Sequence, residues 1–182
     1  MLGNRGVLHD DRRAIVRQSQ VRRWICCVLE WKEIRRTIMK PRSYTELFFL
    51  DEATAFAAGH RPCFECRRAA ALRYQACWPG VTGAAPLADA MDRVLEAERR
   101  LPGGGKKTHA ADVSSLPDGA FLRTGQDAWL LHGGRRWRWT FEGYAESRDR
   151  GAGTVDVLTP AATVAVLRAG YRVSVHPSAA PP

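Results

Sequence analysis

Two cysteines three positions apart, Cys63 and Cys66, are the residues of this sequence best suited to bind a metal ion. They follow Gly59 and Pro62 and open a basic, helix-forming segment. Two thiolates at this spacing bind one Zn²⁺ from a single turn, which is a recurring half of structural zinc sites. The sequence therefore predicts a zinc site with Cys63 and Cys66 as one pair of ligands.

A second pair of cysteines, Cys26 and Cys27, lies upstream in a segment rich in β-forming residues. Neighbouring side chains of a strand point to opposite faces, so two adjacent cysteines seldom reach the same metal ion. Cys27 is the preferred third ligand, because it shares a face with Ile25, Leu29 and Trp31. Cys26 is expected to point the other way, as a free thiol on the exposed face.

A closed tetrahedral zinc site needs a fourth ligand, for which the sequence offers three candidates. His9 is the first, because Asp10 or Asp11 beside it could orient the imidazole ring. His60, close to Cys63, and Cys26 remain as alternatives.

The stretch from Phe48 to Cys66 resembles the metal-binding domain of Ada-type DNA repair proteins. The likeness covers about 25 residues, 44–68, and is carried by Phe48-Phe49-Leu50-Asp51-Glu52-Ala53 and Ala57-Ala58-Gly59-His60-Arg61-Pro62-Cys63-Phe64-Glu65-Cys66. In that family a strand and a short helix precede Ala-Gly-aromatic-Arg-Pro-Cys-x-x-Cys, and four cysteines bind zinc. One upstream cysteine accepts a methyl group from a damaged DNA phosphate, and the domain binds DNA.

The resemblance implies that Cys63 and Cys66 are the downstream zinc ligands and that His60 takes an aromatic position with a packing role. The upstream ligands depart from the family, which has Cys-x-x-x-Cys shortly before the strand, whereas Cys26 and Cys27 are adjacent and farther away. A cysteine in the middle of a strand is less accessible than one in a loop. We therefore expect a zinc-stapled scaffold rather than methyl transfer.

The formal charge of +9 is concentrated near the N-terminus. Residues 1–43 hold eleven Lys or Arg and four Asp or Glu, a balance of 11 − 4 = +7. Such an excess favours a polyanionic partner, most often nucleic acid, since binding releases the counterions of the phosphates. A solvated arm is the alternative. The candidate nucleic-acid-binding residues are Arg35, Arg36, Arg67 and Arg68.

The residue pattern predicts an α+β fold. In the first half we expect a basic arm with one short strand, then a hairpin with strands over 24–31 and 34–39, a strand over 44–50, and helices over 52–58, 64–78 and 87–101. Asp51 is a predicted N-cap and Gly59 a predicted C-terminal stop for the first helix. Three parts follow from this pattern: an Ada-like zinc-binding unit (1–80), a helical connector and linker (81–107), and a β-rich C-terminal unit (108–182).

In the second half we expect strands over 120–123, 128–131, 135–139, 154–158 and 171–175, with one short helix that Thr159 caps and Gly170 ends. Arg136 and Arg138 alternate with Trp137 and Trp139, so one strand face is cationic and the other aromatic. The tryptophans are expected to fill the core and the arginines to be solvated; a phosphate-tracking stripe is the alternative.

The function indicated is that of a zinc-stabilised nucleic-acid-binding protein, with a role in DNA repair or damage recognition implied by the resemblance. A zinc-thiolate methyl acceptor and a zinc-stapled protein-interaction domain are the alternatives, so enzymatic activity is left open. The sequence shows no Ser nucleophile elbow, His-Glu-x-x-His motif or dinucleotide fingerprint. The charged N-terminus and the lack of a long apolar run predict a cytoplasmic protein with reduced thiols and no membrane partner.

Overall fold

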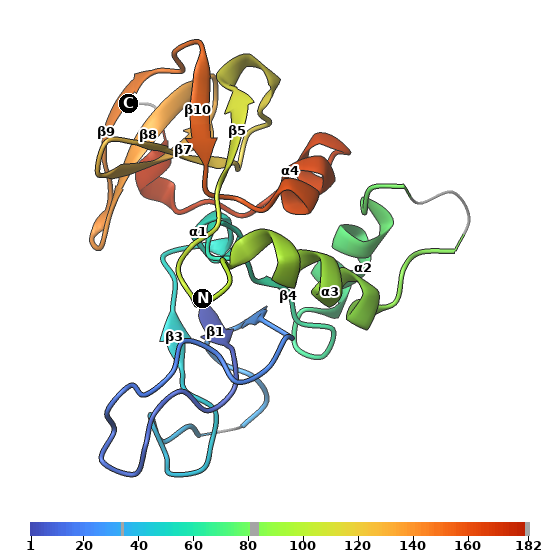
Figure 1. Ribbon diagram of the computed structural model, residues 1–182, viewed down its shortest axis with the longest axis vertical. Coiled ribbons are helices and arrows are strands. Elements are labelled where there is room, and N and C mark those ends of the chain that lie inside the picture. Colours follow the sequence, from blue (N-terminus) through green and yellow to red (C-terminus); the bar gives the residue numbers. More distant parts are fainter. Residues whose placement is uncertain (34, 81–83, 181–182) are drawn as a thin grey trace.

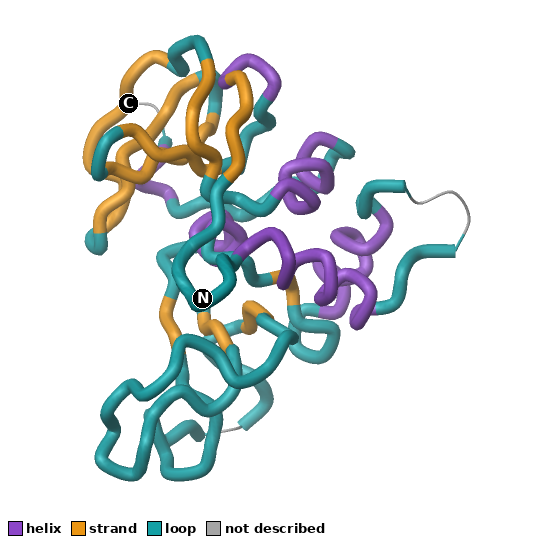
Figure 2. Tube along the Cα trace, viewed as in Figure 1, coloured by secondary structure: helices purple, strands orange, loops and turns teal. Residues whose placement is uncertain are grey.

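The computed structural model describes residues 1–33, 35–80 and 84–180, and it has the α+β architecture that the sequence predicts. A six-stranded sheet forms one end of the molecule, and a small sheet with long loops forms the other (Figure 1). The helices lie between and beside the two sheets. Figure 2 shows that strands dominate the C-terminal end, whereas loops dominate the N-terminal end. None of the described helices is long and apolar enough to cross a membrane.

The N-terminal sheet has four short strands: β1 (Leu2–Asn4), β2 (Ile25–Cys27), β3 (Leu47–Phe48) and β4 (Arg61–Pro62). Their order is β3-β1-β2-β4, with β1 antiparallel to both neighbours and β2 parallel to β4. The start of the predicted basic arm is therefore a central strand of this sheet.

The predicted hairpin over 24–31 and 34–39 is wrong. Only Ile25–Cys27 is a strand, and the described residues between Val28 and Glu46 form loops and turns; Ile34 lies outside the described residues. Side chains satisfy the backbone there in place of a ladder, since Glu46 accepts from the Met39 amide at 2.9 Å and Arg36 donates to the Leu29 carbonyl. Lys32 and Met39 also adopt positive φ angles of 52° and 53°, which break a strand.

The three helices of the first half are α1 (Glu52–Ala57), α2 (Arg68–Ala76) and α3 (Ala88–Arg99). The predicted ends of α1 are confirmed, because Asp51 Oδ1 accepts from the Thr54 amide at 2.8 Å and Gly59 follows with φ +84°. Helix α2 begins four residues later than expected, since the Cys63–Arg67 segment forms turns instead.

The C-terminal sheet is antiparallel throughout, in the order β5-β10-β6-β7-β8-β9. Its strands are β5 (His109–Asp112), β6 (Phe121–Thr124), β7 (Asp127–His132), β8 (Arg135–Thr140), β9 (Gly143–Asp149) and β10 (Thr154–Val157). Short 3₁₀ turns occupy Val113–Ser115 and Pro177–Ala179, and helix α4 spans Ala161–Arg168. Strands β5 and β9 were not predicted.

Two predictions about the C-terminal half are wrong. Thr159 does not cap α4, because its hydroxyl accepts from the Phe121 amide at 2.9 Å, and Glu98 of α3 instead accepts from the Ala162 amide at 2.8 Å. Residues 171–175 do not form a strand. The amides of Ser174 and of His176, just beyond this segment, donate instead to two buried carboxylates at the start of α1.

Those carboxylates belong to Asp51 and Glu52, which are both buried. Their four donors from the C-terminal half are the hydroxyls of Tyr144 and Tyr171, each at 2.7 Å, and the amides of Ser174 and His176, at 3.0 and 2.9 Å. Buried carboxylates need such donors, since an unpaired charge in the interior is costly. Hydrogen bonds to the N-terminal end of α1 therefore connect the two halves of the chain.

The hydrophobic core also crosses the predicted boundary between the units. One cluster combines Phe56, Tyr74 and Leu95 from the first three helices with Val166 and Tyr171 from the C-terminal half. Two further clusters lie around the six-stranded sheet, one with Leu122, Trp129 and Val164 and the other with Phe121, Leu130 and Trp137. Both halves contribute to one shared core.

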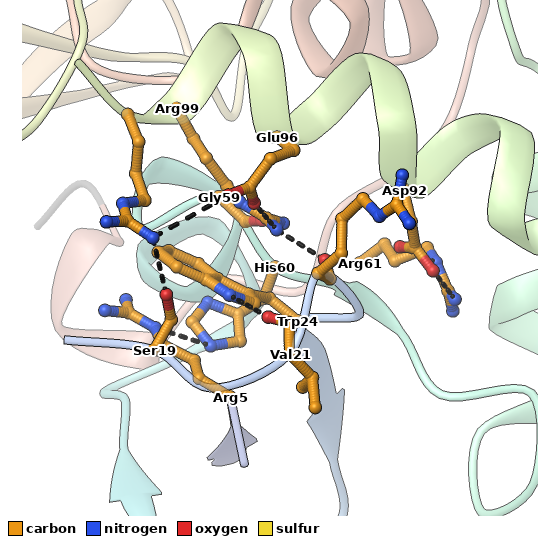
Figure 3. Close-up of polar contacts among 12 residues, drawn as sticks. Arg5, Ser19, Val21, Trp24, Gly59, His60, Arg61, Asp92, Glu96 and Arg99 are labelled. Atoms are coloured by element: carbon orange, nitrogen blue, oxygen red, sulfur yellow. Dashed lines mark hydrogen bonds and ion pairs between the residues drawn. The ribbon is translucent and has the colours of Figure 1, made fainter. Parts of the chain in front are cut away.

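Three basic side chains bind the C-terminal end of α1, and two of them, Arg5 and Arg99, are drawn in Figure 3. The carbonyls of Ala57, Ala58 and Gly59 accept from Lys106 Nζ at 2.6 Å, Arg5 Nη2 at 3.3 Å and Arg99 Nη1 at 3.1 Å. A helix leaves its last carbonyls without partners and carries partial negative charge there, so cations stabilise this end. The Trp24 ring lies between the Arg5 and Arg99 guanidinium groups, 3.8 and 3.9 Å from its centroid.

Candidate metal centre

Three cysteine sulfurs converge on one side of the N-terminal sheet. The Sγ atoms of Cys27, Cys63 and Cys66 all lie within 4.8 Å of one another. Cys27 ends β2, and Cys63 directly follows β4, which runs parallel to β2 in the register Ile25↔Arg61 and Cys26↔Pro62. The next step of that register places Cys27 beside Cys63, and the Cys63 amide donates to the Cys26 carbonyl at 3.1 Å. The predicted third ligand is thus brought to the predicted pair.

A tight turn brings Cys66 back to Cys63. The Arg67 amide donates to the Cys63 carbonyl at 3.1 Å, which closes the turn, and the Glu65 amide donates to Cys63 Sγ at 3.4 Å. Backbone donors of this kind favour the thiolate over the thiol. The turn therefore prepares Cys63 to be a charged ligand.

The three sulfurs fit a tetrahedral zinc ion. A Zn–S bond of about 2.3 Å and tetrahedral angles require sulfurs about 3.8 Å apart. The sulfurs are already within 4.8 Å, so small side-chain movements suffice. Thiolates are soft donors that suit zinc, and hence these three close cysteines could hold a metal ion such as zinc.

Hydrogen bonds link the three thiols, so each cysteine influences the pKa of the other two. A hydrogen bond from Cys27 lowers the pKa of Cys63 to about 5, aided by the amides of Cys66 and Glu65. The pKa of Cys27 is raised by that same bond to Cys63 and by burial, and burial raises the pKa of Cys66. The protein alone thus favours one thiolate flanked by two thiols. A bound divalent cation would stabilise the further thiolates, with release of their protons.

Cys26 points away from the cluster, as strand alternation predicts, but it is not on an exposed face. It is fully buried, and Arg67 Nη1 donates to its Sγ at 3.1 Å. Burial raises the pKa of this thiol to about 12, against the opposing effect of Arg67. The face that carries Cys26 packs on the core: a Cβ atom on its strand partner Gly3 would lie 2.3 Å from Phe49 Cε2. Cys26 is therefore a buried thiol.

The structure does not bring His9 to the sulfurs. His9 is buried, with Nδ1 2.6 Å from Thr45 Oγ1 and Nε2 3.3 Å from the Lys40 carbonyl, so both ring nitrogens already have partners. His60 also lies outside the cluster. Its ring packs between Trp24 and Phe49, and its Nε2 accepts from Arg5 Nε at 3.3 Å, in keeping with the packing role expected of it.

The sulfurs adjoin a cavity of about 270 Å³. The loop between β2 and β3 contributes the lining side chains of Trp31, Arg36 and Tyr44. Asn4 and Glu65 complete its polar lining. Sequence reasoning placed Trp31 on the face of Cys27, but it missed Tyr44, because Tyr44 was expected in a strand over 44–50 rather than in the loop beside the sulfurs.

The four arginines proposed for nucleic-acid binding differ in how far their side chains are exposed. Arg35 and Arg68 are exposed. Arg36 is half-buried, with Nε donating to the Tyr44 hydroxyl at 3.2 Å. Arg67 turns inward instead, and its Nη2 forms a 2.7 Å ion pair with Glu52. These contacts with the buried carboxylate and with the Cys26 sulfur disfavour a surface role for Arg67.

The arginine stripe on β8 makes contacts within the protein. Trp137 is buried, as expected. Arg136 lies over the Trp129 ring at 5.3 Å, and Arg138 pairs with Glu146 at 3.6 Å. The stripe is thus partly neutralised, which disfavours its use to track phosphates.

No protein-family model matches this chain, nor does any curated protein sequence or solved structure. The likeness to Ada-type repair proteins therefore rests on the residues of 44–68 alone.

Proposed function

We propose that the protein is a zinc-stabilised nucleic-acid-binding protein in which Cys27, Cys63 and Cys66 hold the zinc ion. The observation that carries this proposal is the convergence of three cysteine sulfurs within 4.8 Å, at the base of loops rich in exposed basic residues. The resemblance over 44–68 supports the same function and a role in DNA repair or damage recognition.

Zinc in this position would fix the structure around it. Its ligands come from β2, from the end of β4 and from the turn before α2, so the ion would join segments 36 residues or more apart, since 63 − 27 = 36. The loop between β2 and β3 has no strand ladder of its own within its described residues. Binding energy at such a site contributes directly to folding.

The loops next to the site expose many cations. Among the described residues of 10–43, nine Lys or Arg side chains are exposed, against three exposed carboxylates, those of Asp11, Glu30 and Glu33. The nine are Arg12, Arg13, Arg17, Arg22, Arg23, Lys32, Arg35, Lys40 and Arg42. Within the described part of the chain, none of these nine has a carboxylate in ion-pairing distance. Exposed cations without a paired carboxylate, gathered in residues 10–43, are suited to bind a phosphate backbone.

Metal analysis tests the first half of this proposal. We expect one zinc per chain in purified protein, and a large loss of zinc in Cys27→Ser, Cys63→Ser and Cys66→Ser. Cys77→Ser is the matched control, because Cys77 is outside the cluster and its Sγ lies 3.7 Å from the Ala169 carbonyl. Zinc retained in all three cluster variants would contradict the proposal.

Binding to duplex DNA across a range of salt concentrations tests the second half. Each phosphate contact makes the slope of log K against log[salt] more negative by about 0.9. We expect Arg35→Glu and Arg68→Glu to weaken binding and to flatten this slope, whereas Arg123→Glu, in the C-terminal sheet and paired with Asp156, serves as control. Weak binding without salt dependence would instead favour a zinc-stapled protein-interaction domain.

A zinc-thiolate methyl acceptor is a second candidate, favoured by the cavity beside the sulfurs and by the partial exposure of Cys27 and Cys66. In that reaction a cysteine sulfur bonds to the methyl carbon of a phosphotriester, the carbon–oxygen bond breaks, and a phosphodiester anion leaves. Incubation with methylphosphotriester DNA would then add about 14 Da, one methylene, to the intact protein mass. An unchanged mass after incubation of zinc-loaded protein would exclude it.

A further inference from the structure

We propose that the fourth ligand of the metal comes from outside the chain, as a small thiolate that enters the cavity beside Cys27, Cys63 and Cys66. This inference rests on the metal site of the proposed function and goes beyond it by naming the ligand. Its basis is the donor set, the cavity and the charge of the cavity wall.

The described residues offer no fourth donor at the cluster. Among the described residues, no His, Asp or Glu ligand atom joins the three sulfurs within 4.8 Å. His9 and Cys26 are both engaged elsewhere, with Thr45 and with Arg67. The residues outside the described ranges are Ile34, Val81, Thr82, Gly83, Pro181 and Pro182, none of which has an imidazole, thiol or carboxylate in its side chain. Zinc bound by three protein ligands takes its fourth from outside.

The cavity suits a small ligand with one anionic donor. Its volume of about 270 Å³ is below the range of about 300–1,000 Å³ that holds drug-sized molecules. Arg36 contributes a cation to its wall; its Nε bonds to Tyr44 and its Nη1 to Leu29, and its Nη2 has no hydrogen-bond partner among the residues that the structure describes. Trp31, also in the wall, has a buried indole N–H without a hydrogen-bond partner among the described residues. Both groups could stabilise an anion.

A thiolate fits this environment better than an oxyanion does. Three thiolates form a soft donor set, and a fourth thiolate completes a common zinc environment. Leu2 and Ile25 add apolar wall that suits a short carbon chain. On binding, the thiol loses its proton to solvent and its sulfur becomes the fourth ligand, with no change of oxidation state.

Glu65 is the internal rival, because its carboxylate lines the same cavity and lies between two of the ligands in sequence. It lies outside the cluster, and it is exposed. The variant Glu65→Gln removes its charge and keeps its size, so it separates an internal fourth ligand from an external one.

Cobalt substitution tests the inference, because tetrahedral Co²⁺ reports its ligands through its absorption. The protein is freed of metal, loaded with one equivalent of Co²⁺ and titrated with 2-mercaptoethanol, with imidazole, phosphate and a short cysteine-containing peptide as further arms. We expect 2-mercaptoethanol to raise the thiolate-to-cobalt charge-transfer absorption by about one third, from three thiolates to four. The peptide is expected to have a smaller effect at the same concentration, because the cavity is small.

Variants locate the ligand in the cavity. Arg36→Ala should weaken the response to 2-mercaptoethanol several-fold while leaving cobalt uptake intact, and Tyr44→Phe repeats the test with less disturbance of the loop. Arg35→Ala is the matched control, because Arg35 is exposed and outside the cavity lining. Glu65→Gln should respond as the unaltered protein does.

Two outcomes would overturn the inference, and they are distinguishable. If cobalt binds but its spectrum is unchanged at saturating thiol, the site is closed by the chain itself; a response gained only in Glu65→Gln would identify Glu65 as the closing ligand. If cobalt does not bind, the metal site fails and the proposed function fails with it.

Discussion

The Arg61 guanidinium and the Asp92 carboxylate form a bidentate ion pair that is almost wholly buried (Figure 3). Its two hydrogen bonds are 2.8 Å from Nε to Oδ1 and 2.7 Å from Nη2 to Oδ2. The pair fixes the middle of α3 against β4, two residues before the first cysteine of the metal pair. The segment that leads into Cys63 is thus held by a contact with a helix residue 31 positions downstream of Arg61, since 92 − 61 = 31.

Removal of one partner of this pair should be severely destabilising. We expect Asp92→Ala to lower the free energy of unfolding by about 3–5 kcal/mol, because it leaves a buried guanidinium without its counter-charge. The double variant Arg61→Met with Asp92→Leu should cost much less, since it removes both charges and keeps apolar volume. Urea denaturation measures both, and equal losses in the two variants would show that the volume of the side chains matters more than the unpaired charge.

The buried carboxylate of Glu52 provides a second test, through the hydroxyl of Tyr171. Tyr171→Phe should lower the free energy of unfolding by about 1.5–3 kcal/mol, since it removes a hydrogen bond to a charged group. Tyr74→Phe is the matched comparison, because the Tyr74 hydroxyl is also buried and bonds to the neutral Thr163 hydroxyl at 2.8 Å, for which about 0.5–1.5 kcal/mol is expected. A Tyr74 effect as large as the Tyr171 effect would contradict the role given to Glu52.

His60 should make stability depend on pH. Burial, with the nearby Arg5 and Arg99 charges, holds the pKa of His60 well below its usual 6.5 in the folded protein. Below pH 6.5 the unfolded chain therefore binds the extra proton first, so the contribution of His60 to stability is full above pH 6.5 and shrinks as the pH falls. The limiting slope is about 1.4 kcal/mol per pH unit.

The variant His60→Phe isolates this effect. It removes the titrating group and keeps an aromatic ring between Trp24 and Phe49. When the pH is lowered from about 7.5 to about 5, the free energy of unfolding should decrease less steeply for the variant than for the unaltered protein. Parallel profiles would mean that His60 is protonated as readily in the folded state as in the unfolded chain.

Local sequence signals predicted the parts of the fold that local chemistry determines. Asp51 caps α1 and Gly59 ends it, because both roles depend on residues within one helical turn. The alternation of strand side chains separated Cys27 from Cys26, and the short Cys-x-x-Cys spacing marked Cys63 and Cys66. These inferences needed no knowledge of distant partners.

The failed predictions share the opposite cause. Arg67 was expected at the surface, but Glu52, 15 residues upstream, draws it inward. Residues 171–175 have the composition of a strand, yet the Ser174 amide bonds to Glu52, and composition gives no sign of such a partner. The loop after β2 likewise takes its hydrogen bonds from the side chains of Arg36 and Glu46. Each case depends on a polar side chain beyond the next helical turn, 7 residues away within the loop and 15 or 122 residues away in the other two cases, whose partner only the folded chain shows.

Zinc removal should destabilise the N-terminal sheet in particular. A metal that binds only the folded state adds about 2.7 kcal/mol to the free energy of unfolding when free zinc is 100 times its dissociation constant. Treatment with a chelator should therefore lower the melting temperature of the unaltered protein, and added zinc should restore it. Cys63→Ser should start from the lower temperature and respond to neither treatment, whereas Cys77→Ser should behave as the unaltered protein does.

Because β2 carries Cys27 and β4 leads into Cys63, amide hydrogen exchange should accelerate first at these strands when zinc is withdrawn. Uniform acceleration that extends to β6, β7 and β8 would instead mean that the two halves unfold as one cooperative unit.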